Sequence, residues 1–117
     1  YDTIIFIGAS DVTLDGLTIT VKATKKVEYG IGIIAETGEN IARVKVTNCV
    51  IRHLSSSATS LSGIYVRATG GITVSEISFN EIRDYKEDGS ANTRGINVHH
   101  SGGTTAGTIK KTHLLNL

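Results

Sequence analysis

The sequence contains no proline, no methionine and no tryptophan, and its single cysteine is Cys49. One cysteine excludes an internal disulfide and a cluster of thiol metal ligands, and a free cysteine is typically a buried side chain. An excess of one charge is also missing, because 12 Lys and Arg are balanced by 11 Asp and Glu, which leaves a net charge of +1. Such a chain has no overall field that attracts nucleic acid, so nucleic acid is not an expected partner.

Long hydrophobic runs are absent as well. The longest, over residues 3–8 and 30–35, are far shorter than the roughly 20 residues of a membrane-spanning helix, so no membrane span is predicted. With 117 residues, of which 39% are hydrophobic, the chain can bury one modest core. We therefore treat residues 1–117 as a single unit.

Glycine and β-branched residues dominate what is present. The 13 glycines accompany many Ile, Val and Thr residues, and this composition favours pleated strands joined by glycine-containing turns. Apolar residues alternate over short stretches, as in Val44-Lys45-Val46, which is the period-two pattern of a strand. No sustained helical period is found, so the predicted fold class is all-β.

A four-residue pattern, Gly-Ile-x-(Ile/Val), occurs three times at a nearly constant spacing. It begins at Gly30, Gly63 and Gly95, so successive copies lie roughly 32 residues apart, within the range of known solenoid repeats. A second pattern, a pair of aliphatic residues five positions apart, occurs four times with the same period. Two patterns with one period indicate a repeated supersecondary unit that buries its apolar side against the next copy.

The repeat predicts two columns of inward side chains, stepped by the roughly 4.8 Å between neighbouring strands. The first column is Leu14, Val46, Ile77 and Ile109, and the second is Ile19, Ile51, Ile82 and Leu114. The fold that we expect is a parallel β-helix, a solenoid of about three coils of roughly 32 residues each.

Three segments share a strand, a turn and a second strand. They are residues 11–19 (Asp-Val-Thr-Leu-Asp-Gly-Leu-Thr-Ile), 44–51 (Val-Lys-Val-Thr-Asn-Cys-Val-Ile) and 77–82 (Ile-Ser-Phe-Asn-Glu-Ile). In these segments the chain resembles the pectate-lyase-like superfamily of right-handed parallel β-helices. The resemblance covers nearly the whole chain and implies a fragment of a longer right-handed β-helix and a secreted or cell-surface location. Many such proteins stack asparagines in one turn, whereas Asn48 and Asn80 fall one place apart. Either the alignment slips by one residue or no ladder exists.

The catalytic signatures of this superfamily are not found. The sequence lacks the Asp-Asp pair and the Gly-His-Gly of polygalacturonase-like hydrolases, and it shows neither the acidic calcium cluster nor the Arg-containing motif of pectate lyases. The resemblance is therefore specific for the fold. Whether the protein is an enzyme stays open, and a polysaccharide lyase is favoured over a hydrolase.

Each repeated unit contains extra residues, beyond those that a minimal coil of such a fold needs, and they occur at the same place in each unit. Residues 23–29, 53–62 and 84–94 all precede the Gly-Ile-x-(Ile/Val) strand, so stacked coils would bring them together as a wall of loops. Loops on a rigid scaffold are the usual place for binding groups. Beside this wall, the outward positions of the strand align in two columns. The first is Gly32, Tyr65 and Asn97, and the second is Ile34, Arg67 and His99.

These outward columns form the predicted binding floor for an acidic polysaccharide. Tyr65 can stack on a sugar face, and Arg67 can pair with a carboxylate or sulfate in a bidentate way. Asn97 and His99 can hydrogen-bond hydroxyl groups. In a lyase, Arg67 or His99 would be the catalytic base that removes the proton next to a uronate carboxyl group. The alternative is that these side chains only keep an outward strand soluble.

Arg52 and Arg83 are aligned as well, which places like charges one strand spacing apart at some cost in stability. Glu81 lies two residues from Arg83 on the same face and is the expected ion-pair partner. The functional alternative is that Arg52 and Arg83 bind a sulfate or a uronate of the substrate.

No metal site and no cofactor are predicted. His99 and His100 are neighbours on a strand and point to opposite faces, which does not suit a shared metal ion. Residues 84–88, Asp-Tyr-Lys-Glu-Asp, are acidic enough to suggest calcium. They lack the alternating ligands and the final Glu of a helix-loop-helix calcium site, and an exposed turn explains them as well.

The first and last segments, residues 1–7 and 114–117, are apolar strands without a polar cap or a covering helix. Solenoid ends normally carry such a cap, so we expect these ends to pack on further coils of the same protein or on another chain. Two functions stay open. One is a segment of an extracellular protein that binds or degrades an acidic polysaccharide. The other is a non-enzymatic shaft or adhesin, as in a phage tailspike.

Overall fold

The computed structural model describes residues 3–21, 29–53, 60–83, 92–100, 102–110 and 112–115. These residues form twelve strands, and the described part of the chain contains no helix. Accordingly, this part holds no helix of the length and apolar character that crossing a membrane requires. The prediction of an all-β fold is confirmed for the residues that the structure describes.

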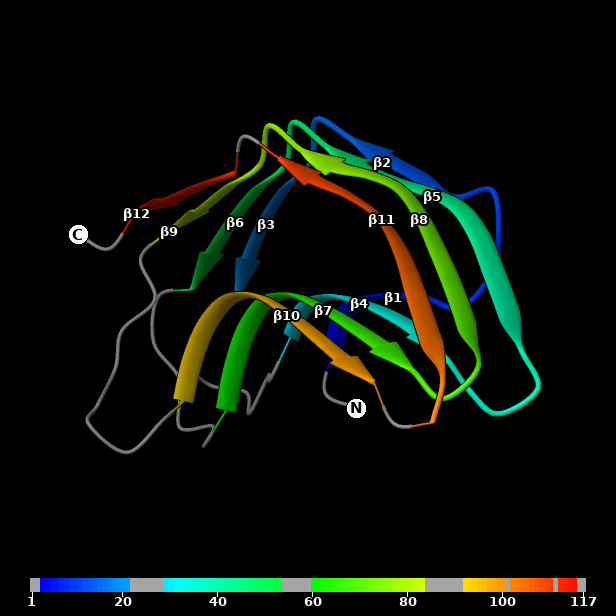
Figure 1. The fold of residues 1–117 in the computed structure, drawn as a ribbon. Helices are drawn as coiled ribbons and strands as arrows, with labels where there is room; N and C mark the ends of the chain where they lie inside the picture. Colours follow the sequence, from blue (N-terminus) through cyan, green and yellow to red (C-terminus); the bar gives the residue numbers. More distant parts are fainter. Residues whose placement is uncertain are drawn as a thin grey trace.

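The twelve strands form three parallel four-stranded sheets (Figure 1). The first sheet has the order β1 (Thr3–Ile7), β4 (Tyr29–Ala35), β7 (Ser60–Ala68) and β10 (Asn92–His100). The second has the order β11 (Thr104–Lys110), β8 (Gly71–Ser78), β5 (Asn40–Thr47) and β2 (Thr13–Asp15). The third has the order β12 (His113–Leu115), β9 (Glu81–Arg83), β6 (Val50–His53) and β3 (Thr18–Val21).

The chain visits the three sheets in turn, so every third strand belongs to the same sheet. We call each set of three consecutive strands a repeat, from repeat 1 (β1–β3) to repeat 4 (β10–β12). Hydrogen-bonded neighbours in each sheet come from successive repeats and run parallel. The Gly-Ile pattern revealed only three of these four sets, because Ile4 in repeat 1 occupies the place that Gly30 holds in repeat 2.

The strand register confirms that the residues of both predicted columns are aligned. Val46 pairs with Leu14 and Ile77, and Ile77 pairs with Ile109. Ile51 likewise pairs with Ile19 and Ile82, and Ile82 pairs with Leu114. One hydrophobic cluster joins all three sheets, because Ile33, Val46 and Ile51 belong to it and are fully buried. The sheets therefore share one core, which their aliphatic columns fill.

The regular spacing of the glycines reflects close packing between the first and third sheets. A Cβ atom on Gly63 would lie 2.8 Å from Cγ2 of Ile82 and 2.9 Å from the carbonyl oxygen of Gly95. One repeat earlier, a Cβ atom on Gly30 would lie 2.8 Å from both Cγ2 of Ile51 and the carbonyl oxygen of Gly63. Gly30 and Gly63 thus leave room for Ile51 and Ile82 of the third sheet.

The turn between the second and third sheets settles the question of the asparagine ladder. Ser78 pairs with Thr47, so Asn80 lies beside Cys49 and not beside Asn48. Asn48 instead occupies a left-handed turn position with φ 53°, and the equivalent residues Gly16 and Phe79 have φ 73° and 56°. The two asparagines have different structural roles, and no ladder forms between them.

Asn80 is buried and bonds the backbone of the preceding repeat. Its Oδ1 accepts a hydrogen bond from the Cys49 amide at 3.0 Å, and its Nδ2 donates to the Val46 carbonyl at 2.9 Å. Cys49 is itself a buried free cysteine, as the sequence predicted. A single carboxamide therefore satisfies one donor and one acceptor where the chain turns.

Two carboxylates connect repeats 1 and 2 at the surface. Arg43 donates to Asp11 from Nη2 to Oδ2 at 2.9 Å and also from Nε to Oδ1. The hydrogen bond lowers the pKa of Asp11 and raises the pKa of Arg43. Asp15 Oδ1 accepts from Asn48 Nδ2 at 2.9 Å and from Thr47 Oγ1 at 3.0 Å, and these bonds lower the pKa of Asp15. Both carboxylates are therefore bound most tightly in their ionised form.

Gly63→Ala should destabilise the protein by about 1–3 kcal/mol, because the new methyl group meets both a side chain and a backbone oxygen. Gly32→Ala is the matched control, since its methyl group would lie 3.1 Å from the Thr3 methyl group on the edge strand β1. We expect the control to change the free energy of unfolding by less than about 1 kcal/mol. Urea unfolding measures the free energy of unfolding of both variants. An equal loss in Gly63→Ala and Gly32→Ala would contradict the packing explanation.

Asn80→Asp should lower the melting temperature strongly at neutral pH. A buried carboxylate would face the Val46 carbonyl without a proton to donate, at a cost of about 3 kcal/mol or more. Burial raises the folded-state pKa of such a carboxyl group, so its penalty grows as pH rises above the unfolded value and shrinks as pH falls. Thermal melts between about pH 4 and pH 7 test this. Asn40→Asp, at an exposed position, should show little change.

Asp15→Asn should lower the melting temperature at neutral pH and lose this effect in acid. A carboxyl group whose folded pKa is lowered stabilises the fold above the unfolded value, near pH 4, and the gain disappears as pH falls through the folded pKa. Thr47→Val removes one of the two donors to Asp15, so it should lose part of the stabilisation that the Asp15 carboxylate provides at neutral pH. A gap between wild type and Asp15→Asn that persists unchanged in acid would contradict this assignment.

Candidate functional site

The predicted floor residues Tyr65, Arg67, Asn97 and His99 lie on two adjacent strands of the first sheet. Asn97 pairs with Tyr65, and His99 pairs with Arg67, in the parallel register of β10 and β7. On the other side of β7, Gly32 pairs with Tyr65 and Ile34 pairs with Arg67. The register confirms both outward columns that the sequence predicted. We call the side of this sheet that faces away from the core its outer face.

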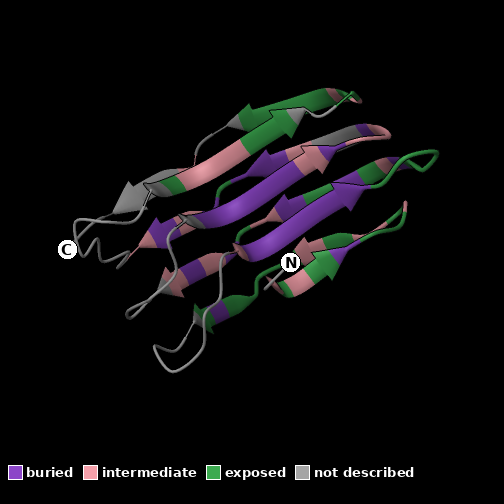
Figure 2. Ribbon diagram, turned by 90° about the horizontal axis from the view of Figure 1, so that it is seen from below, coloured by how far each residue is buried: buried purple, intermediate pink, exposed green. Residues whose placement is uncertain are grey.

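Figure 2 shows the first sheet from below, with β4 and β7 mostly buried between the more exposed strands β1 and β10. Burial extends to outward positions. Ile34 is 1% exposed although it does not belong to the core cluster, and Tyr65 is 7% exposed. The Tyr65 ring stacks on Tyr29, with ring centroids 4.1 Å apart and planes 8° apart. Tyr65 therefore offers little open surface to a sugar in this conformation.

The polar members of the floor are more open. Arg67 and Asn97 are half-buried, and His99 is exposed. Because Arg67 and His99 are register partners, a guanidinium and an imidazole lie one strand spacing apart on the outer face. Asn97 lies two residues before His99, so its carboxamide belongs to the same face of β10. His99 presents its imidazole to solvent, and the half-buried Arg67 and Asn97 add a guanidinium and a carboxamide on the same face.

Arg52 and Arg83 lie elsewhere, on strands β6 and β9 of the third sheet. They are register partners, as predicted. Arg83 Nη1 donates to Glu81 Oε1 at 3.2 Å, which confirms Glu81 as the partner of Arg83. The six residues that the sequence singled out therefore divide into four on the first sheet and two on the third.

Phe6 is a residue of the outer face that the sequence reasoning missed. It pairs with Gly32, which extends the column of Gly32, Tyr65 and Asn97 to β1, and it is 58% exposed. The spacing gives no signal for it, because the step from Ile5 to its partner Ile31 is several residues shorter than the period of the other repeats. Alternation gives no signal either, because residues 4–7 of β1 are all apolar.

The predicted wall of loops lies largely outside the described residues, because it includes residues 23–28, 54–59 and 84–91. The acidic segment 84–88, considered for calcium, also lies outside them. Within the part of the chain that the structure describes, no group of three or more His, Cys, Asp or Glu side chains gathers as metal ligands would.

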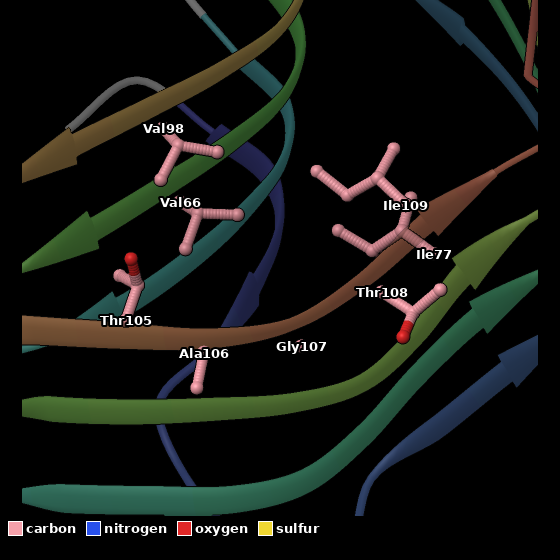
Figure 3. Close-up of a pocket in the computed structure, with 8 residues that line it drawn as sticks. All are labelled: Val66, Ile77, Val98, Thr105, Ala106, Gly107, Thr108 and Ile109. Atoms are coloured by element: carbon pink, nitrogen blue, oxygen red, sulfur yellow. The ribbon is translucent and has the colours of Figure 1, made fainter.

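Two hollows are found away from the outer face. One, of about 230 Å³, lies between β10 and β11 and is lined mainly by aliphatic side chains, including Val66, Ile77, Val98 and Ile109 (Figure 3). It borders the core, because Ile77 and Ile109 belong to the first aliphatic column. The other, of about 330 Å³, is an open groove over the glycine-rich turns between the first and second sheets, beside Asn40 and Thr104. Neither hollow contains a floor residue.

The geometry suits ionic and hydrogen-bonding recognition of an anion. Arg67 can bind a carboxylate or sulfate through two parallel N–H groups, and His99 can add a further donor one strand away. The carboxylates whose pKa is lowered, Asp11 and Asp15, belong to contacts between repeats 1 and 2. They are part of the scaffold and not of the floor.

A scan against protein-family models, a search of curated proteins and a search of solved structures each found no match to this chain. The outer face of the first sheet is therefore the candidate site.

Proposed function

We propose that this protein binds an acidic polysaccharide on the outer face of the first sheet. The observation that carries the proposal is the register of β7 and β10, in which Arg67 lies beside His99 and Tyr65 lies beside Asn97. A guanidinium, an imidazole and a carboxamide are thus brought to one face by two neighbouring strands. A polymer that crosses from β7 to β10 passes from Arg67 to His99 over about 4.8 Å.

Each floor residue has a group that suits one part of an acidic polysaccharide. Arg67 forms charge-assisted hydrogen bonds with a uronate carboxylate or a sulfate, which are stronger than bonds between neutral groups. Asn97 both donates and accepts, so it suits a sugar hydroxyl. His99 is exposed, so it can reach a second group of the same polysaccharide. The net charge of +1 does not attract anions, so local groups must supply the affinity.

The proposal includes a finer description of the fold. Three parallel sheets visited in turn, with a period of roughly 32 residues, support a right-handed parallel β-helix of the pectate-lyase-like kind. In this proposal the protein is a segment of a secreted or cell-surface protein, as that resemblance implies. Further turns of the same helix would extend the face that carries Arg67 and His99.

Catalysis would add one step to binding. In a lyase, Arg67 or His99 removes the C5 proton next to the uronate carboxyl group, the C4–O4 glycosidic bond breaks, and the departing oxygen takes up a proton from solvent, which leaves a sugar with a C4–C5 double bond. The proposal commits to binding, and the same samples reveal turnover because the unsaturated uronate absorbs ultraviolet light.

A non-enzymatic shaft or adhesin is the second candidate, favoured by how the chain uses its charges and aromatics. Asp11 and Arg43 pair between repeats, and Tyr29 and Tyr65 stack on each other. Such contacts stiffen a scaffold and leave fewer groups for a ligand. A shaft would show no preference among anionic polymers.

Arg67→Ala and His99→Ala should weaken binding to alginate, pectate, chondroitin sulfate or heparin, whichever wild type binds, as measured by titration calorimetry. Loss of a charge-assisted hydrogen bond costs about 1.5–3 kcal/mol, so we expect roughly a tenfold loss or more for Arg67→Ala. The unsaturated product is followed by absorbance in the same mixtures.

Lys45→Ala is the matched control, because it removes one positive charge from an exposed position of the second sheet. It should leave the affinity within about twofold of wild type, since an exposed distant charge contributes little. Thermal melts show whether each variant folds, and His99→Ala alters an exposed side chain if Arg67→Ala proves unstable. Absence of binding to all four polymers by wild type would favour the shaft. An equal loss in Lys45→Ala would reduce the interaction to nonspecific attraction.

A further inference from the structure

We infer that Phe6 is the aromatic platform on which a sugar ring of this polysaccharide packs. The inference rests on the proposed function and assigns to Phe6 the stacking role that the sequence assigned to Tyr65. Phe6 is 58% exposed, whereas Tyr65 is 7% exposed and covered by Tyr29. Of these two aromatic rings in one column, only Phe6 presents a large open surface.

The position of Phe6 connects it to the polar floor. It pairs with Gly32, and Gly32 pairs with Tyr65, so the Phe6 ring lies in the same outward column two strands away. Two strand spacings correspond to about 10 Å. Gly32 has no side chain, so nothing from this position rises between the Phe6 ring and the floor residues of β7 and β10.

The Phe6 ring lies over Gly8, two residues further along the chain. A Cβ atom on Gly8 would lie 2.5 Å from Phe6 Cε1 and 3.0 Å from Cζ. The ring therefore rests directly against Gly8, which has no side chain to displace it. A side chain at position 8 would displace the ring from this orientation.

Phe6 and Arg67 together suit an acidic oligosaccharide better than a single sugar. The apolar C–H face of a pyranose packs on an aromatic ring through dispersion and loss of apolar hydration. The carboxylate of a later sugar then reaches Arg67, which lies about 10 Å along the column and about 7 Å along the strand from Phe6. One sugar unit cannot touch both, so Phe6 should contribute only to ligands of several units.

Phe79 provides a matched control, because the chain has two phenylalanines and Phe79 is 50% exposed at the turn between the second and third sheets. Phe6→Leu and Phe79→Leu each remove one exposed ring and keep an apolar side chain. With the polymer among alginate, pectate, chondroitin sulfate and heparin that wild type binds most tightly, Phe6→Leu should weaken binding about threefold to tenfold. Phe79→Leu should bind as wild type does.

A tryptophan at each site gives a second measurement. The protein has no tryptophan, so Phe6→Trp and Phe79→Trp each introduce a single fluorophore. Polymer should protect the indole of the Phe6→Trp variant from iodide quenching and leave quenching of the Phe79→Trp variant unchanged, while Phe6→Trp retains wild-type affinity. Single sugars should protect neither fluorophore.

The outcomes separate this inference from the proposed function. Unchanged affinity in Phe6→Leu, alongside weakened binding in Arg67→Ala, would overturn the platform and leave the polar floor intact. Equal losses in Phe6→Leu and Phe79→Leu would also overturn it. No binding of any of the four polymers by wild type would overturn both. If Phe6→Leu fails to fold, an unprotected fluorophore in polymer-bound Phe6→Trp overturns the platform by itself.

Discussion

The structure depends on the in-register stacking of parallel strands from successive repeats. Branched aliphatic residues are aligned with one another on neighbouring strands along the core. Val46 pairs with both Leu14 and Ile77, and Ile51 pairs with both Ile19 and Ile82. A slip of one residue would turn every such side chain to the opposite face. The same register decides what lies on the outer face, and therefore which residues can act together on a ligand.

Polar contacts between repeats reinforce this register. Asn80 bonds the backbone of the preceding repeat through both ends of its carboxamide, and Asp15 accepts from Thr47 and Asn48. Each bond joins positions about one period apart in the sequence, so it forms only when the repeats are aligned. Gly30 and Gly63 also favour this register, because they leave room for Ile51 and Ile82 of the third sheet.

On the first sheet, some outward side chains pack against one another, and others stay open for a ligand. Stacking of Tyr65 on Tyr29 and burial of Ile34 cover part of the outer face over β4 and β7, where Arg67 is half-buried. The open groups are left at its sides, with Phe6 on β1 and His99 on β10. A ligand on this face would therefore contact an aromatic ring near one edge and polar groups near the other.

Features that follow from the period could be predicted from the sequence. The aliphatic columns, the pairing of Arg67 with His99 and the partnership of Glu81 with Arg83 all depend on spacing and strand alternation. Burial of Tyr65 could not be predicted, because it depends on a ring stack with a residue at the start of another strand. The exposed phenylalanine of β1 was missed because repeat 1 departs from the period.

The left-handed turn residues were equally hidden. Asp11 and Arg43 both have positive φ, and neither residue type indicates this conformation strongly enough to be recognised from sequence. Their ion pair follows from that backbone and from the register of repeats 1 and 2. Sequence periodicity thus predicts which strands align, and it does not predict local conformations that only the alignment makes favourable.

The register of β7 and β10 is the central claim, and nuclear Overhauser effects between backbone protons test it most directly. The account predicts contacts linking Arg67 to the neighbourhood of His99, and Tyr65 to that of Asn97. Contacts displaced by one residue, such as Arg67 opposite Val98, would contradict it. That outcome would place His99 and Arg67 on opposite faces and remove the basis of the proposed floor.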